Sequence, residues 1–321
     1  MGQTIRNFSA FSMKKIAFVT LFPDWIRESL GHSIMARAEA SGVVEFQVVN
    51  PRNFCYESHR KADDVPYGGH PGMLMKAEPV ALAIESLLRQ YEQASINVGL
   101  CTDQLDEPKS DPGGVTESSQ GSCEATDAII NPLRAKRDTS SDGEVGGPNP
   151  QDYLRPLGEP GEAIERSEYK KPSIAIVITE PSGNRFEQEQ AEELAQYDNI
   201  IFVCGHYEGI DHRIEETFAT HVFSIGDYVL TNGELPALVM ADAVVRLLPG
   251  VLGNQDSLEE ESFQNNMLGA PNYTRPEVWR EKPIPDVLKS GNHKQIDEWR
   301  REQAFEITKL RRPDLLDRKK P

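Results

Sequence analysis

The 321-residue sequence has no apolar stretch that approaches the roughly 18 to 20 residues needed to cross a lipid bilayer. Its first twelve residues are polar and lack the apolar core of a secretion signal. We therefore expect a soluble, cytoplasmic protein that has no membrane partner. A chain of this length has room for two domains and a substantial core.

The sequence is also poor in cysteine and lacks the common nucleotide-binding motifs. Its four cysteines, Cys55, Cys101, Cys123 and Cys204, form no Cys-x-x-Cys pair and have no histidines at zinc-ligand spacing. We expect reduced thiols, two in the folded core and two in a loop. The absence of G-x-G-x-x-G and of a P-loop excludes the usual dinucleotide and phosphate sites.

Basic residues are scarce overall, but the charge is unevenly distributed. The net charge is −17, which at first argues against a nucleic-acid partner because phosphate contacts dominate that affinity. Residues 102–171 hold 8 basic and 15 acidic side chains, whereas residues 276–321 hold 12 basic and 9 acidic ones. The local field at a binding face matters more than the total charge, so an RNA partner remains compatible with this composition.

Alternating apolar runs and amphipathic stretches predict an α/β fold with a parallel sheet. We expect strands at residues 15–21, 44–49, 173–180, 200–203 and 222–225, and helices at residues 23–40, 77–93, 187–197, 235–248 and 292–311. A long polar loop is expected at residues 53–75. In the last helix, Ile296, Trp299, Ile307 and Leu310 form one stripe with Phe305 opposite, which favours Trp299 as a core residue over an RNA-stacking one.

Glycine-bearing loops follow three of the expected strands. Gly205 follows the strand at 200–203, Gly226 follows the strand at 222–225, and a Pro181-Ser182-Gly183 turn follows the strand that starts at Ser173. Ligands of open α/β sheets bind where loops leave the carboxyl ends of such strands, and a backbone without Cβ atoms can approach a planar ligand closely. These loops predict one small-molecule cradle, with ordinary strand-to-helix turns as the alternative.

Several longer motifs are more specific than their composition. VCGHYEGIDHR, SIGDYVLTNGELPAL, RLLPGVLG and YTRPEVW, with LFPDW, HRKADDVPYGGHPGMLM and the EPSG turn upstream, closely resemble the bacterial tRNA (guanine-N1)-methyltransferases of the TrmD family. The resemblance covers about three quarters of the chain and leaves out residues 1–12 and roughly 100–171.

The resemblance implies a fold that the periodicity does not. Threaded chains are rare, so the pattern alone favours an unknotted sheet. The family implies the SPOUT fold, in which a deep trefoil knot holds S-adenosylmethionine, and a homodimer with its active site at the interface. The implied organisation is a disordered tail (1–12), a knotted methyltransferase domain (13–253) with a disordered acidic insertion (about 100–171), a flexible linker (254–275) and a small helical tRNA-binding C-terminal domain (276–321).

The implied activity is methylation of N1 of the guanosine immediately 3′ of the tRNA anticodon, at position 37. Guanine N1 carries a proton, so methyl transfer needs a general base near N1 and a donor that stabilises charge on O6. The resemblance places the arginine at Arg246 and the carboxylate at Glu261, where the family usually has aspartate. Glu259 or Glu260 would serve if the register slips.

The resemblance also assigns binding residues. S-adenosylmethionine is expected against Pro181, Gly205, Glu208, Ser224, Ile225, Gly226, Asp227, Tyr228, Val229, Leu230 and Gly233. The resemblance places RNA against Arg60, Asp63 and Asp64. The charge on the last helix, apart from the resemblance, predicts RNA contacts of Lys294, Arg300, Arg301 and Arg311, with a solvated helix face as the alternative. His70 and Asn232 stand where the family usually has glycine. The family activity is associated with Mg²⁺, but no metal ligand is assigned; Asp63 and Asp64 as a metal pair are the less favoured interpretation, since hard cations need more oxygen ligands.

Two alternatives stay open at this level. The Asp-to-Glu change at Glu261 allows a tRNA-binding protein that keeps the fold without catalysis. A SPOUT enzyme that methylates the ribose 2′-hydroxyl is the other alternative. The role of the acidic insertion and the start codon, Met1 or Met13, cannot be inferred from the sequence.

Overall fold

The computed structural model describes residues 13–57, 59–69, 71–102, 173–252 and 261–318. The chain divides into two compact units, one of residues 1–50, 63–77 and 173–321, and the other of residues 51–62 and 78–172. The expected tail at 1–12 and nearly all of the expected acidic insertion lie outside the described residues. Within the described part of the chain, no helix has the length and apolarity needed to span a membrane.

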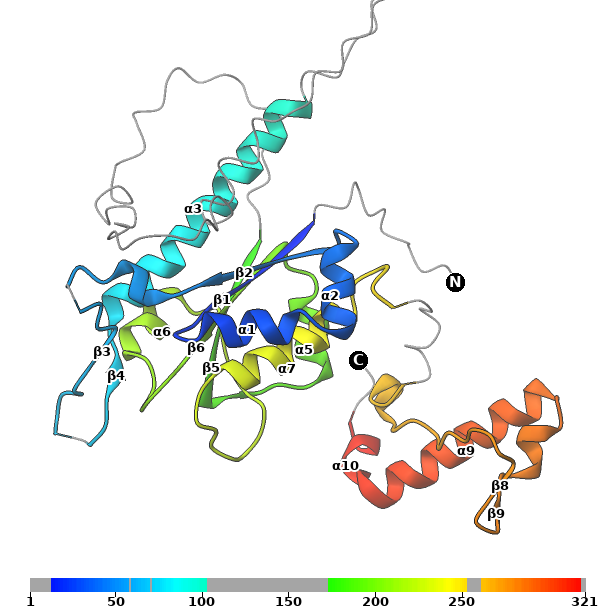
Figure 1. The fold of residues 1–321 in the computed structure, drawn as a ribbon. Helices are drawn as coiled ribbons and strands as arrows, with labels where there is room; N and C mark the ends of the chain where they lie inside the picture. Colours follow the sequence, from blue (N-terminus) through cyan, green and yellow to red (C-terminus); the bar gives the residue numbers. More distant parts are fainter. Residues whose placement is uncertain (1–12, 58, 70, 103–172, 253–260, 319–321) are drawn as a thin grey trace, which may run out of the picture. The chain divides into compact units, whose positions relative to one another are not determined.

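The first unit is built on a five-stranded parallel sheet (Figure 1). Its strands are β1 (Lys14–Val19), β2 (Val44–Val49), β5 (Ile174–Arg185), β6 (Asn199–Cys204) and β7 (His221–Ser224), in the order β2-β1-β6-β5-β7. The continuous apolar runs of β1 and β6 are buried on both faces, as parallel strands usually are. The predicted parallel α/β architecture is confirmed.

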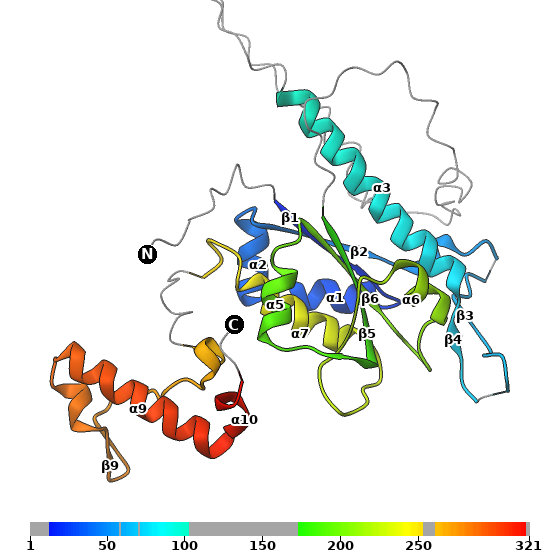
Figure 2. The same cartoon turned by 180° about the vertical axis from the view of Figure 1, so that it is seen from behind.

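Four helices gather on one face of this sheet: α1 (Pro23–Leu30), α2 (Ser33–Ala40), α5 (Gln188–Leu194) and α7 (Glu234–Val245) (Figure 2). Alternate strand residues point into the core beneath them, where Phe18 stacks on Phe202 with ring centroids 5.5 Å apart. The single helix predicted over residues 23–40 is wrong. Gly31, a poor helix former, caps α1, and Ser33 at φ 53° restarts the chain as α2.

Strand β5 is longer than predicted. The sequence places its end before the Pro181-Ser182-Gly183 turn, but the strand continues to Arg185. Thr179 and Asn184 both pair with Phe223, so the residues between them bulge out of the ladder. Pro181 cannot donate a ladder hydrogen bond, which explains why the break falls there.

The shorter elements correct two more predictions. The loop expected at 53–75 contains η1 (Pro51–Phe54) and a hairpin of β3 (Asp63–Asp64) and β4 (Leu74–Met75). In the second unit, α3 (Ala77–Thr102) runs nine residues past its predicted end and includes Cys101, which was expected in a loop. Cys204 is buried, Cys55 is half-buried, and Cys123 lies outside the described residues. Helix α6 (His212–Phe218) had not been predicted.

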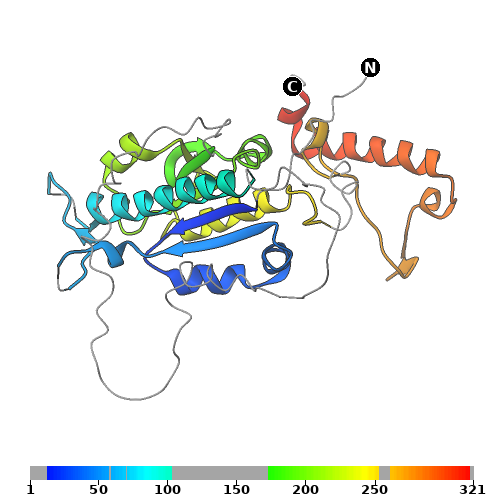
Figure 3. The same ribbon diagram turned by 90° about the horizontal axis from the view of Figure 1, so that it is seen from above.

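The C-terminal segment contains η3 (Gln264–Asn266), the hairpin β8 (Val278–Trp279) and β9 (Lys282–Pro283), η4 (Asp286–Lys289), α9 (His293–Arg311) and α10 (Pro313–Leu316) (Figure 3). The predicted helix at 292–311 is confirmed, with Asn292 as its N-cap. Its predicted stripe is partly wrong, because Leu310 is 80% exposed while Ala304 and Thr308 are buried. Thr308 Oγ1 accepts a hydrogen bond from Leu268 N at 2.8 Å and so fastens the chain before β8 to α9.

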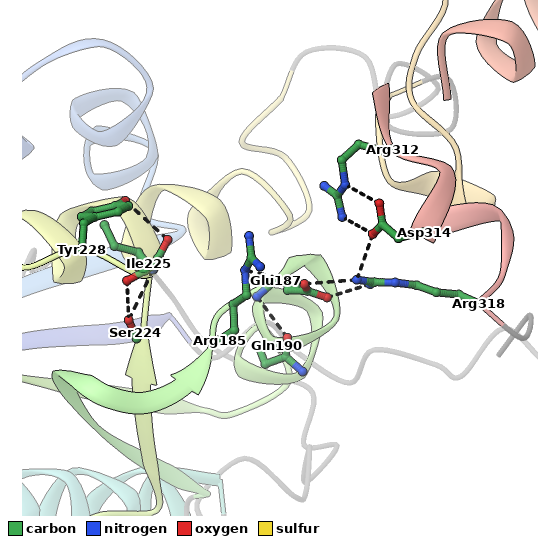
Figure 4. Close-up of polar contacts among 10 residues, drawn as sticks. Arg185, Glu187, Gln190, Ser224, Ile225, Tyr228, Arg312, Asp314 and Arg318 are labelled. Carbon is green, nitrogen blue, oxygen red and sulfur yellow. Dashed lines mark hydrogen bonds and ion pairs between the residues drawn. The ribbon is translucent and has the colours of Figure 1, made fainter. Parts of the chain in front are cut away.

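An ion pair ties the end of the chain to the start of α5 (Figure 4). Arg318 donates to both carboxylate oxygens of Glu187, at 2.7 and 3.2 Å. Glu187 is the N-cap of α5, and its backbone N–H donates to Gln190 Oε1 at 3.0 Å. The Arg318 hydrogen bond is the main cause that lowers the pKa of Glu187. The contact is bidentate, but both side chains are partly exposed, so we expect it to contribute about as much as other surface ion pairs.

This ion pair predicts a pH-dependent stability. A carboxyl whose pKa is depressed by folding stabilises the fold above its unfolded value, near 4.3, and loses that contribution as the pH falls through its lower folded value. We expect Arg318→Ala to lower the melting temperature at pH 7 by the equivalent of about 1 kcal/mol or less, the range of exposed pairs. The difference from the parent protein should shrink as the pH falls below about 4.3.

Arg301→Ala is the matched control, since in the described part of the chain the Arg301 guanidinium donates to a backbone carbonyl, that of Asp297, and to no carboxylate. A difference between Arg318→Ala and the parent that is constant from pH 7 to pH 3 would show that the carboxylate of Glu187 does not carry the effect.

Candidate functional site

A hollow of about 190 Å³ opens at the carboxyl edge of the sheet in the first unit. Three chain segments line it, which follow the regular parts of β5, β6 and β7. Its lining residues are Thr179, Glu180, Pro181, Gly205, His206, Tyr207, Glu208, Gly209, Phe223, Ser224, Ile225, Gly226, Tyr228, Val229, Leu230, Thr231, Asn232, Gly233 and Pro236. The carboxyl ends of parallel strands meet at one edge of a sheet, so three loops distant in sequence converge on one cavity.

Close backbone contacts hold two of these loops together. Gly233 N donates to Gly205 O at 2.7 Å, and Thr179 Oγ1 donates to Gly233 O at 3.1 Å. A Cβ atom on Gly233 would lie 2.3 Å from Thr179 Oγ1 and 2.6 Å from Gly205 N. Only glycine fits at this position, because the clashing atoms include backbone that cannot move away.

Gly205 differs from Gly233 in this respect. A Cβ atom on Gly205 would meet nothing closer than Ile210 Cγ1 at 3.6 Å, an ordinary van der Waals contact. The protein's own packing therefore does not require glycine there. A glycine that the fold does not need, in the wall of a cavity, points to close approach by a bound molecule.

The β3–β4 hairpin braces the loop that follows β6. Met75 N donates to Gly209 O at 3.0 Å, and Glu208 N donates to Met73 O at 3.0 Å. The Glu208 side chain lies over Gly72, where a Cβ atom would come within 2.5 Å of its Cγ. Gly72 has a φ of 105°, so both space and backbone conformation favour glycine at that position.

The structure gathers most of the residues predicted to bind the cofactor. Ten of the eleven line the hollow, and the exception is Asp227, which lies in the same loop but does not line it. Their role in binding stays a prediction. The sequence interpretation missed nine lining residues, and all but Thr179 and Pro236 adjoin a residue that was predicted. The nine are Thr179, Glu180, His206, Tyr207, Gly209, Phe223, Thr231, Asn232 and Pro236.

Buried polar groups surround the floor of the hollow. Thr20 Oγ1 donates to Glu234 Oε1 at 2.5 Å, and the side chain of Glu234 is fully buried at the start of α7. Burial is the main cause that raises the pKa of the Cys204 thiol, with the nearby Glu234 charge as the second. Burial, then the charge of Glu215, raises the pKa of Glu180, so the wall of the hollow contains a carboxyl that holds its proton more tightly than usual.

The two predicted catalytic residues form an ion pair. Arg246 Nη2 donates to Glu261 Oε1 at 2.6 Å, and this hydrogen bond is the main cause that raises the pKa of Arg246. Neither residue lines the hollow. Arg246 caps the C-terminus of α7 and Gly233 its N-terminus, so the two ends are about 20 Å apart at 1.5 Å per residue. Glu259 and Glu260, the alternatives to Glu261, lie outside the described residues.

The residues predicted to bind RNA fall into two groups. Lys294, Arg300, Arg301 and Arg311 all project from α9, and all but the partly buried Arg300 are exposed. Asp63 and Asp64 lie in β3 of the first unit, whereas Arg60 belongs to the second unit and is exposed with φ 46°. Asp64 lies 3.7 Å from Lys76 Nζ. Successive strand residues point to opposite faces, which argues against Asp63 and Asp64 as a shared metal site.

The sequence comparisons agree with this geometry. A family model described as tRNA (guanine-1)-methyltransferase TrmD matches residues 13–107 and 141–318. The chain belongs to the TrmD family. The TrmD match leaves out residues 108–140, whereas the motifs predicted a longer gap of roughly residues 100–171. Residues 100–107 and 141–171 therefore match the family model as well.

Similar proteins carry the name tRNA (guanine-N(1)-)-methyltransferase. The one from Kocuria rhizophila is 40% identical over 94% of this chain and 86% of its own length. The one from Alkaliphilus oremlandii is 36% identical over 94% of this chain and 91% of its own. The one from Bacillus licheniformis is 38% identical over 94% of this chain and 92% of its own length. This TrmD family member therefore matches its relatives over nearly their full length.

Two glycine substitutions should separate folding from binding. We expect Gly233→Ala to lower the melting temperature strongly, by the equivalent of roughly 1–3 kcal/mol, because its Cβ atom overlaps backbone. We expect Gly205→Ala to keep the melting temperature of the parent protein but to weaken S-adenosylmethionine binding at least tenfold, because the methyl group narrows the hollow. Thermal unfolding and calorimetric titration measure the two effects. Unchanged affinity in a folded Gly205→Ala protein would contradict this role for Gly205.

Proposed function

We propose that this protein transfers the methyl group of S-adenosylmethionine to N1 of the guanosine immediately 3′ of the tRNA anticodon, at position 37. The observation that carries the proposal is the Arg246–Glu261 pair, in which a donor and an acceptor stand side by side at 2.6 Å. Guanine presents its N1–H donor next to its O6 acceptor. When guanine binds, Arg246 can donate to O6 instead of to Glu261, and Glu261 can accept from N1–H instead of from Arg246. The pair is therefore complementary to that edge of guanine.

Each residue of the pair has a distinct chemical task. Glu261 accepts the N1 proton, which frees the lone pair that attacks the methyl carbon. Arg246 donates to O6, where negative charge develops as the proton leaves, and its raised pKa keeps it charged throughout. Glutamate and aspartate have similar basicity, so the glutamate at 261 suits the same task.

The hollow suits S-adenosylmethionine, which supplies an electrophilic methyl group on a sulfonium centre. Gly205 leaves the backbone of one wall open to a planar purine, whereas the space over Gly226 is filled by the Tyr228 ring, 2.5 Å from where a Cβ atom would lie. In the SPOUT fold the chain that forms these loops is knotted. The bulge in β5 and the loop that joins β7 to α7 are the segments that we propose to take part in the knot.

We further propose that two copies of the chain complete each site. The length of α7 keeps Arg246 about 20 Å from the hollow of its own chain, so the Arg246–Glu261 pair must serve the hollow of a partner. Helix α7 consists mostly of apolar residues, and two of them face outward, since Leu235 is 42% and Val239 50% exposed; Asp242 is its one exposed charged residue. An apolar helix face left open on one chain is the surface that a symmetric dimer buries.

The basic residues of α9 are proposed to contact the tRNA backbone. Phosphate contacts need exposed lysine or arginine, and Lys294, Arg301 and Arg311 meet this condition. In the described part of the chain, no group of three or more His, Cys, Asp or Glu side chains is arranged to hold a metal ion, and no residue is proposed as a ligand of Mg²⁺.

Methyl transfer to tRNA transcripts tests the proposal. The parent protein should methylate a transcript with guanosine at position 37 and not one with adenosine there, and the product should carry the methyl group on the base. We expect Glu261→Gln to lower kcat by about 10² to 10⁴, the contribution of a general base, with little change in KM. Glu192→Gln, on an exposed face of α5, is the matched control. Binding without turnover, or a methylated ribose, would replace this proposal.

The shared site makes a separate prediction. Gly205→Ala lacks a working hollow, and Glu261→Gln lacks a working base, so each variant alone should be nearly inactive. When the two are mixed in equal amounts and allowed to exchange subunits, half of the dimers are mixed, and each mixed dimer contains one intact site. We expect the mixture to regain about a quarter of the parent activity. A mixture as inactive as its components would show that each chain uses its own Arg246 and Glu261.

A further inference from the structure

The hairpin of β8 and β9 exposes a tryptophan side chain, the largest of the twenty. Trp279 is 57% exposed, and its neighbour Val278 is equally exposed. Strands of two residues each, Val278–Trp279 and Lys282–Pro283, form the whole of this sheet. Figures 1 and 2 show the hairpin projecting from the C-terminal segment. Aromatic side chains are normally buried, because each removes a large apolar area from water.

Arginine covers one part of the exposed ring. The guanidinium carbon of Arg280 lies 4.8 Å from the centroid of Trp279. Trp279 and Arg280 together form a layered pair of planar groups, which we call the Trp279–Arg280 stack. Indole and guanidinium planes both pack face to face on nucleobases, and guanidinium also donates to phosphate.

The turn that carries Arg280 has an unusual backbone conformation. Arg280 has a φ of 48° and Glu281 a φ of 68°, so two successive residues with side chains are left-handed. Hairpin turns of this type normally use Asn and Gly there. Residues with strained backbone angles occur often at functional positions, where the function requires the side chain despite its unfavourable conformation. A glycine at 280 would relieve the strain and remove the guanidinium.

Other aromatic residues of the C-terminal segment fit a stacking role less well; among them Tyr273 is 50% and Phe263 46% exposed. Trp299 was weighed in the sequence analysis as an RNA-stacking residue. It is half-buried on α9, and its ring centroid lies 6.3 Å from that of Tyr273. Phe305 is 44% exposed, but no ring or cation contact orders it in the described residues. Among the described residues of this segment, Trp279 combines exposure with a cation over its ring and with Lys282 opposite it in the hairpin.

We propose that the Trp279–Arg280 stack binds an unpaired base of the tRNA. This inference rests on the proposed function, since the guanosine next to the anticodon lies in a single-stranded loop. Bases in a duplex are hidden by their neighbours, whereas a loop offers bases whose faces are free to stack. Arg280 and Lys282 supply cations for the adjacent phosphates, but Glu277 and Glu281 lie in the same segment, so the indole face and not the net charge of the hairpin carries the proposed contact.

Equilibrium binding of the intact tRNA transcript across a range of salt concentrations tests the stack. Loss of one base stack weakens binding by about 5- to 150-fold. We expect Trp279→Ala to lower affinity within this range at every salt concentration, with an unchanged salt dependence, since no phosphate contact is lost. Trp279→Phe should recover most of the loss. Arg280→Ala should weaken binding and also reduce the slope of log K against log salt by about one.

Leu310→Ala is the matched control, because Leu310 is 80% exposed on α9 of the same segment. The inference is overturned if Trp279→Ala binds the tRNA as tightly as the parent protein. It is also overturned if Trp279→Ala is monomeric while the parent protein is dimeric, since the hairpin would then contact a second copy of the chain. If the parent protein methylates position 37 while Trp279→Ala binds normally, only this inference fails. If the parent protein neither binds nor methylates tRNA, the proposed function fails.

Discussion

The hydrogen bond from Gly233 N to Gly205 O is the contact on which the candidate site depends. It joins the loop after β6 to the loop that enters α7, and Thr179 of β5 fastens the same glycine from its other side. With no Cβ atom between them, three strand ends approach closely enough to enclose one hollow. A larger side chain at Gly233 would separate the loops, and the hollow would open into a groove.

Helix α7 then sets the distance between the parts of the site. It begins at the hollow and ends at Arg246, which pairs with Glu261. A rigid helix of this length keeps the groups that act on the base away from the loops of the same chain. In the proposed dimer the separation becomes useful, because the exposed side of α7 brings the pair from one chain to the hollow of the other. Dimerisation and catalysis then depend on one element.

The sequence predicted the regular part of this arrangement well and the irregular part less well. Strands β1, β2, β6 and β7 were found within two residues at each end, because buried parallel strands are continuous apolar runs bounded by turn residues. The errors fall where tertiary contacts override local preference. Pairing with Phe223 on both sides of the bulge carries β5 past Pro181, and Leu310 lies outside its stripe because Thr308 is anchored to Leu268 instead.

The amino-acid sequence by itself determined the fold class, the family, and the residues around which the chemistry is proposed, because motif identity and apolar period are properties of the linear chain. Only the tertiary structure decided that ten of the predicted residues surround one hollow, that Asp227 does not line it, and that Arg246 meets Glu261 at 2.6 Å. It also decided that Trp279 is exposed while Trp299 is half-buried. The reason is physical: contact and exposure depend on how distant segments pack, and no local pattern of residues records that packing.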